Sequence, residues 1–141
     1  MITFDSQNIN MPALDFDRVG EWLKVVASNF GKRISRLSYL FCDDEEILRV
    51  NREFLGHDYF TDIITFDYSS ADRIGGDMII SLETVASNAE EMRVDYREEL
   101  LRVIAHGVLH LCGVNDKGPG EREIMEREEN RALSIWKEMN Q

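Results

Sequence analysis

The sequence has few of the features that mark a secreted or membrane-bound protein. Its 141 residues include only two cysteines, Cys42 and Cys112, which exclude a disulfide framework and leave Cys112 as a minor candidate for a metal ligand. No apolar run approaches the roughly 18 residues that span a bilayer. The N-terminal sequence, MITFDSQNIN, lacks the basic start and apolar core of a signal peptide. We therefore expect a cytoplasmic protein that does not contact membranes.

Positive charge is also scarce. Lysine and arginine total 16 against 27 acidic residues, which gives a formal net charge of -11. A nonspecific nucleic-acid binder gains most of its affinity by neutralising phosphates, so this charge balance argues against that class of protein. Lys32, Arg33 and Arg36 do cluster. The cluster is either a solvated entrance to a strand or a short phosphate-binding track, and both interpretations stay open.

Length and hydrophobic periodicity predict one α+β domain over residues 1–141. The chain is long enough to bury a stable core without disulfide bonds or structural metal ions, and 43% of its residues are hydrophobic. Alternating or β-branched segments predict strands at residues 2–4, 34–42, 61–67 and 76–80. Helices are expected from Asp15 or Asp17 to about residue 30, after Asp43, at 81–92, at 96–112 and from Pro119. We expect about five helices packed with a small mixed sheet of about four strands.

Capping patterns support two of these helices. Asp43 with Glu46, and Asp95 with Glu98, have the spacing of a capping box, in which each side chain bonds the other residue's backbone N–H. The helix that follows Asp95 has a wide apolar face, as expected of a helix packed in the core. The residues of this face are Leu100, Leu101, Ile104, Val108 and Leu111.

The strongest chemical signal is a pair of histidines in that apolar helix. His106 and His110 lie one turn apart, so both imidazoles can converge on one point. Gly113 is placed to end the helix and to turn Asp116 back toward the rings. Two imidazoles and one carboxylate with a fourth position open form a catalytic zinc arrangement. The alternative is a partly buried polar pair. The apolar helix favours the metal because buried ring nitrogens need partners.

Three sequence blocks resemble one known family. They are Asn51 to Phe66 (NREFLGHDYFTDIITF), Gly76 to Ser81 (GDMIIS) and His106 to Asp116 (HGVLHLCGVND). In this order they are similar to the YbeY-type endoribonucleases, which are bacterial factors of ribosomal RNA maturation and predicted metalloproteins. The resemblance covers nearly the whole chain. It implies a YbeY-like fold and metal-dependent cleavage of single-stranded ribosomal RNA, with the small ribosomal subunit or its proteins as partners.

Two positions depart from the family pattern. Asp116 stands where the family usually has the third histidine of its metal site. A carboxylate can replace imidazole on Zn²⁺, and it widens the range of divalent metals that one site accepts. Leu55 stands where the family usually has an arginine that contacts RNA phosphate. Leucine cannot make that contact, and Arg52, about one turn earlier, can replace it only in part.

The resemblance also supplies two candidates for a general base, Asp62 and Asp77. Each belongs to one of the matching blocks, and each could equally be a structural aspartate that bonds backbone amides at a strand edge. Gly107 occupies the position at which zinc proteases carry their catalytic glutamate, which weakens a protease interpretation. Tyr59 and Phe60 either stack on unpaired bases or serve packing.

Two main hypotheses follow from the sequence. The first is a zinc-dependent endoribonuclease with one ion, held by His106, His110 and Asp116. The second is a non-catalytic ribosome-assembly factor that keeps its metal for stability, and Leu55 and the acidic composition favour it. Hydrolysis of a small phosphoester or amide is a third and weaker alternative.

Overall fold

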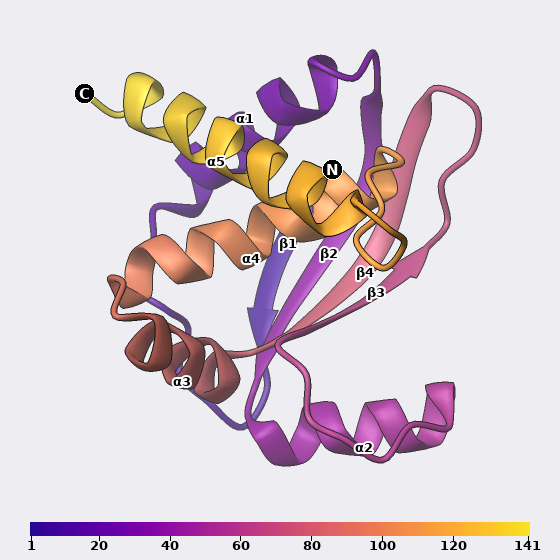
Figure 1. Ribbon diagram of the computed structural model, residues 1–141, viewed down its shortest axis with the longest axis vertical. Coiled ribbons are helices and arrows are strands. Elements are labelled where there is room, and N and C mark those ends of the chain that lie inside the picture. The colour runs from indigo at the N-terminus through magenta and orange to yellow at the C-terminus, as the bar shows by residue number, and fades with distance from the viewer.

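Four strands form one mixed sheet in the computed structural model, which describes residues 1–141. The strands are β1 (Ile2–Ser6), β2 (Arg33–Cys42), β3 (Ile63–Asp67) and β4 (Arg73–Ser81). Their order across the sheet is β1-β2-β4-β3. β1 and β4 both run parallel to β2, whereas β3 runs antiparallel to β4 (Figure 1). The predicted small mixed sheet of about four strands is confirmed.

Five helices complete the predicted α+β architecture. They are α1 (Phe16–Ser28), α2 (Asp44–Leu55), α3 (Leu82–Met92), α4 (Tyr96–Leu111) and α5 (Glu121–Met139). A side chain caps each of the first four helices by accepting a hydrogen bond from the backbone N–H three residues later. These caps are Asp15, Asp43, Ser81 and Asp95. None of the helices combines the length and the apolar composition that crossing a bilayer requires.

Two local predictions were wrong in part. The capping boxes are one-sided, because Glu46 pairs with Arg49 and Glu98 pairs with Lys137 and neither bonds its cap residue. The last helix begins at Glu121, and Pro119 lies outside it. The N–H of Gly118 donates to the Glu121 carboxylate at 2.7 Å, which holds residues 118–121 in a turn before the helix starts.

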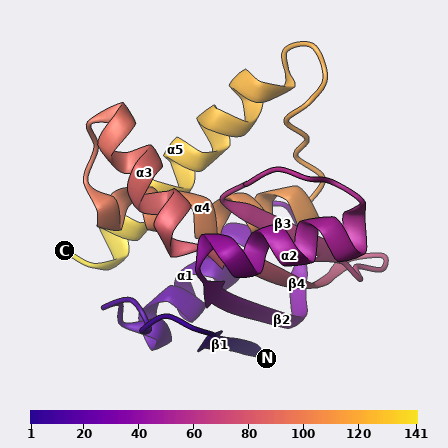
Figure 2. The same cartoon turned by 90° about the horizontal axis from the view of Figure 1, so that it is seen from below.

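The sheet separates two cores of unequal size. The larger core fills the space between one face of the sheet and helices α1, α3, α4 and α5, with Met78 and Ile80 of β4 contributing to it. The smaller core lies on the opposite face under α2, where Ile47 and Val50 meet Ile64 of β3. Figures 1 and 2 show α2 alone on its side of the sheet. Alternate residues of β4 therefore face different helices.

Helix α4 is held tightly against the sheet. The Tyr39 hydroxyl donates to the carbonyl oxygen of Ile104 at 2.8 Å, in the middle of the helix. A Cβ atom added to Gly107 would lie 2.9 Å from Met78 Cγ and 3.2 Å from Ile63 Cδ1. Only a residue without a side chain fits this contact. The turn that carries both histidines is therefore fixed in position against β3 and β4.

Close packing makes Gly76 of β4 intolerant of a side chain. An added Cβ would lie 2.5 Å from the carbonyl oxygen of Phe66, and backbone cannot move aside as a flexible side chain can. Gly76→Ala should lower the free energy of unfolding by about 1–3 kcal/mol, measured by urea denaturation.

Gly20 of α1 provides the matched control. Its added Cβ would meet only Ile2 Cδ1, at an ordinary 3.9 Å. Alanine is the better helix former, so Gly20→Ala should raise the free energy of unfolding by roughly 0.5–1 kcal/mol. Equal effects of the two substitutions would contradict this description of the packing.

Candidate active site around His106

A cavity of about 950 Å³ opens beside helix α4. Its walls come from α2 and the segment between α2 and β3, from β3 itself, and from the end of α3 with the residues after it. Helix α4, the segment that leads into α5, and the first half of α5 complete them. Residues 99, 102, 103, 106 and 110 line it from α4, a spacing that places them along one face of that helix. The rest of α4 is largely buried, so this stripe is where the central helix meets the cavity.

His106 is held between two carboxylates in the wall of this cavity. Its Nε2 atom lies 3.3 Å from Oδ2 of Asp116, and its Nδ1 atom lies 2.7 Å from Oε2 of Glu129 in α5. The predicted return of Asp116 toward His106 is therefore observed. Gly113 makes that return with a φ of 98°, a conformation that favours glycine.

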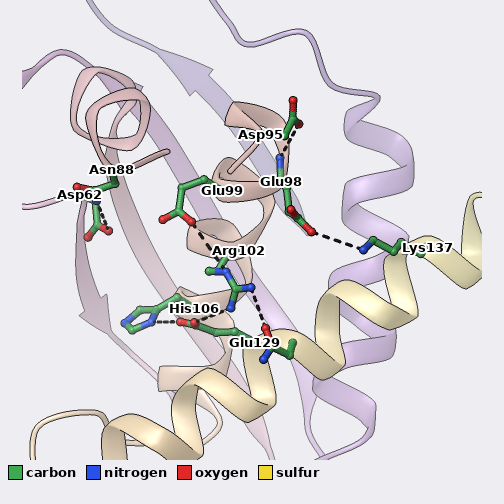
Figure 3. A network of polar contacts seen from close by, with 10 residues as sticks. Asp62, Asn88, Asp95, Glu98, Glu99, Arg102, His106, Glu129 and Lys137 are labelled. Atoms are coloured by element: carbon green, nitrogen blue, oxygen red, sulfur yellow. Dashed lines mark hydrogen bonds and ion pairs between the residues drawn. The ribbon is translucent and has the colours of Figure 1, made fainter. Parts of the chain in front are cut away.

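Glu129 joins His106 to Arg102 one turn earlier in α4. Its Oε1 atom accepts a hydrogen bond from Arg102 Nη1 at 3.2 Å, while Oε2 contacts the imidazole (Figure 3). Arg102 also donates to Asn130 at 2.8 Å. One carboxylate from α5 therefore fixes two side chains of α4, and the orientation of the His106 ring depends on how α5 packs.

These carboxylates change the acidity of His106. Burial alone would lower the pKa of the imidazole. The hydrogen bond to Glu129 and the negative charges of Glu129, Asp116 and Asp62 outweigh burial, so the pKa of His106 is raised above its ordinary value.

The donor set of the predicted metal site fits a divalent ion in kind. A metal-bound histidine commonly uses one ring nitrogen for the metal and donates the other N–H to a carboxylate, and Glu129 is such a partner for Nδ1 of His106. His110 lines the same cavity one turn along α4. The structure brings His106 and Asp116 into contact, but no three histidine, cysteine or acidic side chains lie close enough together to form a metal cluster. The three-residue metal site thus stays a prediction.

Two more carboxylates line the cavity, one from the segment before β3 and one from α4. Asp62, which precedes β3, accepts a hydrogen bond from Asn88 Nδ2 of α3 at 3.4 Å. Glu99 of α4 is only 4% exposed. Burial raises the pKa of Asp62, and the nearby charge of His106 offsets this only in part. Burial also raises the pKa of Glu99, and the charge of Arg102 offsets it only in part.

Asp77, the other candidate base, lies outside the cavity. Its neighbour Met78 packs toward α4, so Asp77 points to the opposite face of the sheet, where its Oδ1 atom accepts a hydrogen bond from Ser38 at 2.8 Å. The structure does not bring Asp77 to the histidines. Its observed partner is the Ser38 hydroxyl of the neighbouring strand β2, not a backbone amide.

Most other residues named from the sequence lie at the edge of the cavity or outside it, together with His57, the third histidine of the chain. His57 and Tyr59 line the rim and contact each other at 3.0 Å. Leu55 also lines it, whereas Arg52 points out and pairs with Asp58. Cys112 lies outside the lining, and burial raises the pKa of its thiol to about 11, so it is no thiolate at neutral pH.

Sequence reasoning missed Glu129, Arg102 and Glu99. Glu129 lies in α5, which is rich in charged residues, and Glu99 and Arg102 lie in the charged first half of α4. In both places nothing local separates a cavity residue from a solvated one. The only signal was indirect. A histidine buried in an apolar helix requires a partner on each ring nitrogen, and Asp116 supplies just one.

Comparisons with known proteins give the family. The family model described as Endoribonuclease YbeY matches residues 2–137. The chain belongs to the YbeY family. Endoribonuclease YbeY of Parabacteroides distasonis is 57% identical over 97% of this chain and 96% of its own length. Its counterpart in Bacteroides thetaiotaomicron is 54% identical over 95% of this chain and 98% of its own length.

A solved structure supports the fold. The solution structure of TM1509 from Thermotoga maritima superposes with a TM-score of 0.70, at 24% identity, over 99% of this chain and 92% of that one. The resemblance drawn from the three sequence blocks is therefore confirmed for the family and for its α+β fold.

The raised pKa of Glu99 predicts a pH-dependent gain in stability for Glu99→Gln. Since its folded-state pKa lies above the unfolded value of about 4.3, Glu99 costs the fold stability as pH rises through that raised value. Glutamine carries no such charge. Glu99→Gln should unfold at a higher urea concentration than wild type at neutral pH, and the difference should shrink toward about pH 4.

Glu98→Gln is the matched control for this measurement. Glu98 is half-exposed and pairs with Lys137, so its replacement removes no buried charge and brings no gain at neutral pH. If the stability difference between Glu99→Gln and wild type is the same at every pH, the raised pKa of Glu99 in the folded protein is contradicted.

Proposed function

We propose that the protein is a metal-dependent endoribonuclease that cuts single-stranded RNA at the cavity beside α4. One observation carries the proposal: His106 is held between Asp116 and Glu129 in the wall of a cavity large enough for part of an RNA strand. Relatives that match nearly the whole chain are named endoribonucleases. The family and the chemistry of the cavity thus support the same class of reaction.

A divalent ion is part of the proposal. His106, through Nε2, His110 and Asp116 are the residues that would hold it, with Zn²⁺ as the expected ion and other divalent metals as alternatives. When bound, the ion supplies Lewis-acid chemistry toward a phosphodiester. The contribution of the protein is orientation. Glu129 holds the His106 ring with Nε2 toward Asp116, and α4 holds His110 one turn further along the same wall.

Asp62 is the general base in this proposal. It lines the cavity, and burial raises its pKa, which brings a carboxylate closer to the range of an effective general base. RNA offers its own 2′-hydroxyl as a nucleophile, so a base in this position would act on the substrate or on water. Asn88 donates to Asp62 Oδ2 and so orients the carboxylate.

Two cations supply the positive charge that an RNA backbone needs. Lys117 and Arg122 line the cavity next to Asp116, and neither forms an ion pair with the protein. Arg102, the remaining arginine of the lining, is already held by Glu129 and Asn130. Phosphate contacts would therefore come from the side of α5, opposite to Leu55.

Ribosomal RNA is the proposed substrate, with the small ribosomal subunit or its proteins as partners in the cytoplasm. The support is the resemblance to the YbeY-type maturation factors. An acidic protein gains little nonspecific affinity for RNA. Recruitment by a protein partner would bring this cavity to one RNA segment, and the protein would not need to bind other RNA.

The decisive experiment compares metal content and RNA cleavage in wild type and His110→Ala. Elemental analysis of purified wild type should give near-stoichiometric zinc, and cleavage of single-stranded RNA should be detectable on the same samples. His110→Ala should lose both, because the ion loses one of three protein ligands. His57→Ala controls for the loss of a histidine and should keep its metal, since His57 bonds Tyr59 at the rim.

Other outcomes would change the conclusion. Stoichiometric metal without cleavage would favour the ribosome-assembly factor. Absence of metal from the wild type would refute the site of His106, His110 and Asp116.

A further inference from the structure

One buried oxygen in the cavity has no partner. Oε1 of Glu99 accepts no hydrogen bond, and its nearest cation, Nε of Arg102, lies 3.9 Å away. The Glu99 side chain is 6% exposed and lines the cavity. A buried acceptor without a donor lowers the stability of the fold, and a bound ligand with an N–H group would remove this cost.

The surroundings of Glu99 restrict what can supply that donor. Asp62 and Asn88 line the same part of the cavity, and in Figure 3 the side chains of Asp62, Glu99 and His106 lie around one space. These groups are mostly acceptors of hydrogen bonds. Apolar side chains line the cavity beside them, and these are Met92, Val94, Val103 and Met125. A nucleobase that carries an amino group fits this lining, because its flat faces can pack on the apolar side chains and its amino group can donate to the acceptors.

The position along α4 fits a base near the scissile bond. Glu99 precedes His106 by seven residues, which is two turns and about 10 Å along the helix axis. Both residues lie on the cavity face of α4. A strand with a phosphate at His106 can therefore place a neighbouring base against Glu99.

From these observations we propose that the Glu99 carboxylate is the acceptor of a base-recognition subsite for a nucleobase with an exocyclic amino group. The inference rests on the proposed ribonuclease function and adds a sequence preference to it. Cytosine and uracil distinguish a donor from an acceptor at this position, because cytosine carries an N4 amino group where uracil carries the O4 oxygen. The amino group donates to a carboxylate, whereas O4 of uracil would face it as a second acceptor.

Binding of short 2′-O-methyl oligocytidylate and oligouridylate tests the subsite without requiring turnover. These oligonucleotides lack the 2′-hydroxyl nucleophile, and a gel run after each titration checks that they are intact. Fluorescence anisotropy at neutral pH should give about tenfold tighter binding of oligocytidylate by the wild type. Glu99→Gln should lose most of this preference, because a carboxamide can turn its NH₂ group toward O4 of uracil.

Glu98→Gln is the matched control, and it should keep the wild-type preference. It makes the same change of charge one residue away, on the side chain that pairs with Lys137. Equal binding of the two oligonucleotides by the wild type, or equal loss of preference in both variants, would overturn the subsite and leave the ribonuclease proposal standing. Binding of neither oligonucleotide by the wild type would overturn the subsite, whereas the ribonuclease proposal depends on the metal content and RNA cleavage of the wild type.

Discussion

The position of α4 against the sheet is the constraint on which the candidate site depends. Ten of the 16 residues of this helix are buried. The contact of Gly107 with Met78 leaves no room for a shift of the helix toward β4. A helix enclosed in this way can present polar groups along one stripe only. That stripe carries Glu99, Arg102, His106 and His110 into a single cavity.

The same constraint explains the acid-base chemistry of the cavity. Carboxylates from three other parts of the chain, Asp62, Asp116 and Glu129, surround a stripe that itself contains Glu99. Close negative charges raise the pKa of His106, and burial raises those of Asp62 and Glu99. A cavity rich in acceptors needs donors or cations from outside. A divalent ion at the histidines and an amino-bearing base at Glu99 would each supply what the protein itself lacks.

Local rules predicted much of the fold. Caps such as Asp15 and Ser81, and the positive φ of Gly113, follow from interactions within a few residues, so the helices they begin or end could be read from the sequence. The start of α5 could not. The turn that displaces Pro119 from this helix depends on a bond between Gly118 and the Glu121 side chain. A small sheet packed with helices followed from the count of strands and helices, whereas the strand order and the directions of pairing required the structure.

The site could be predicted only where its parts are close in sequence. His106 and Asp116 are joined by one helix end and one glycine, and the structure brings them together as expected. Glu129 reaches His106 across 23 residues through the packing of α5 on α4, which no spacing rule describes. Asp77 faces the side of the sheet away from the histidines, as its alternation with the apolar Met78 indicates.

Cleavage of single-stranded RNA before and after chelation is the most direct test of the central claim, that this cavity is a metal-dependent ribonuclease site. We expect the chelated protein to lose cleavage and to regain it when zinc is restored. Its helical circular dichroism should persist throughout, because apolar packing holds α4. Cleavage that continues at the same rate in the chelated protein would contradict this claim.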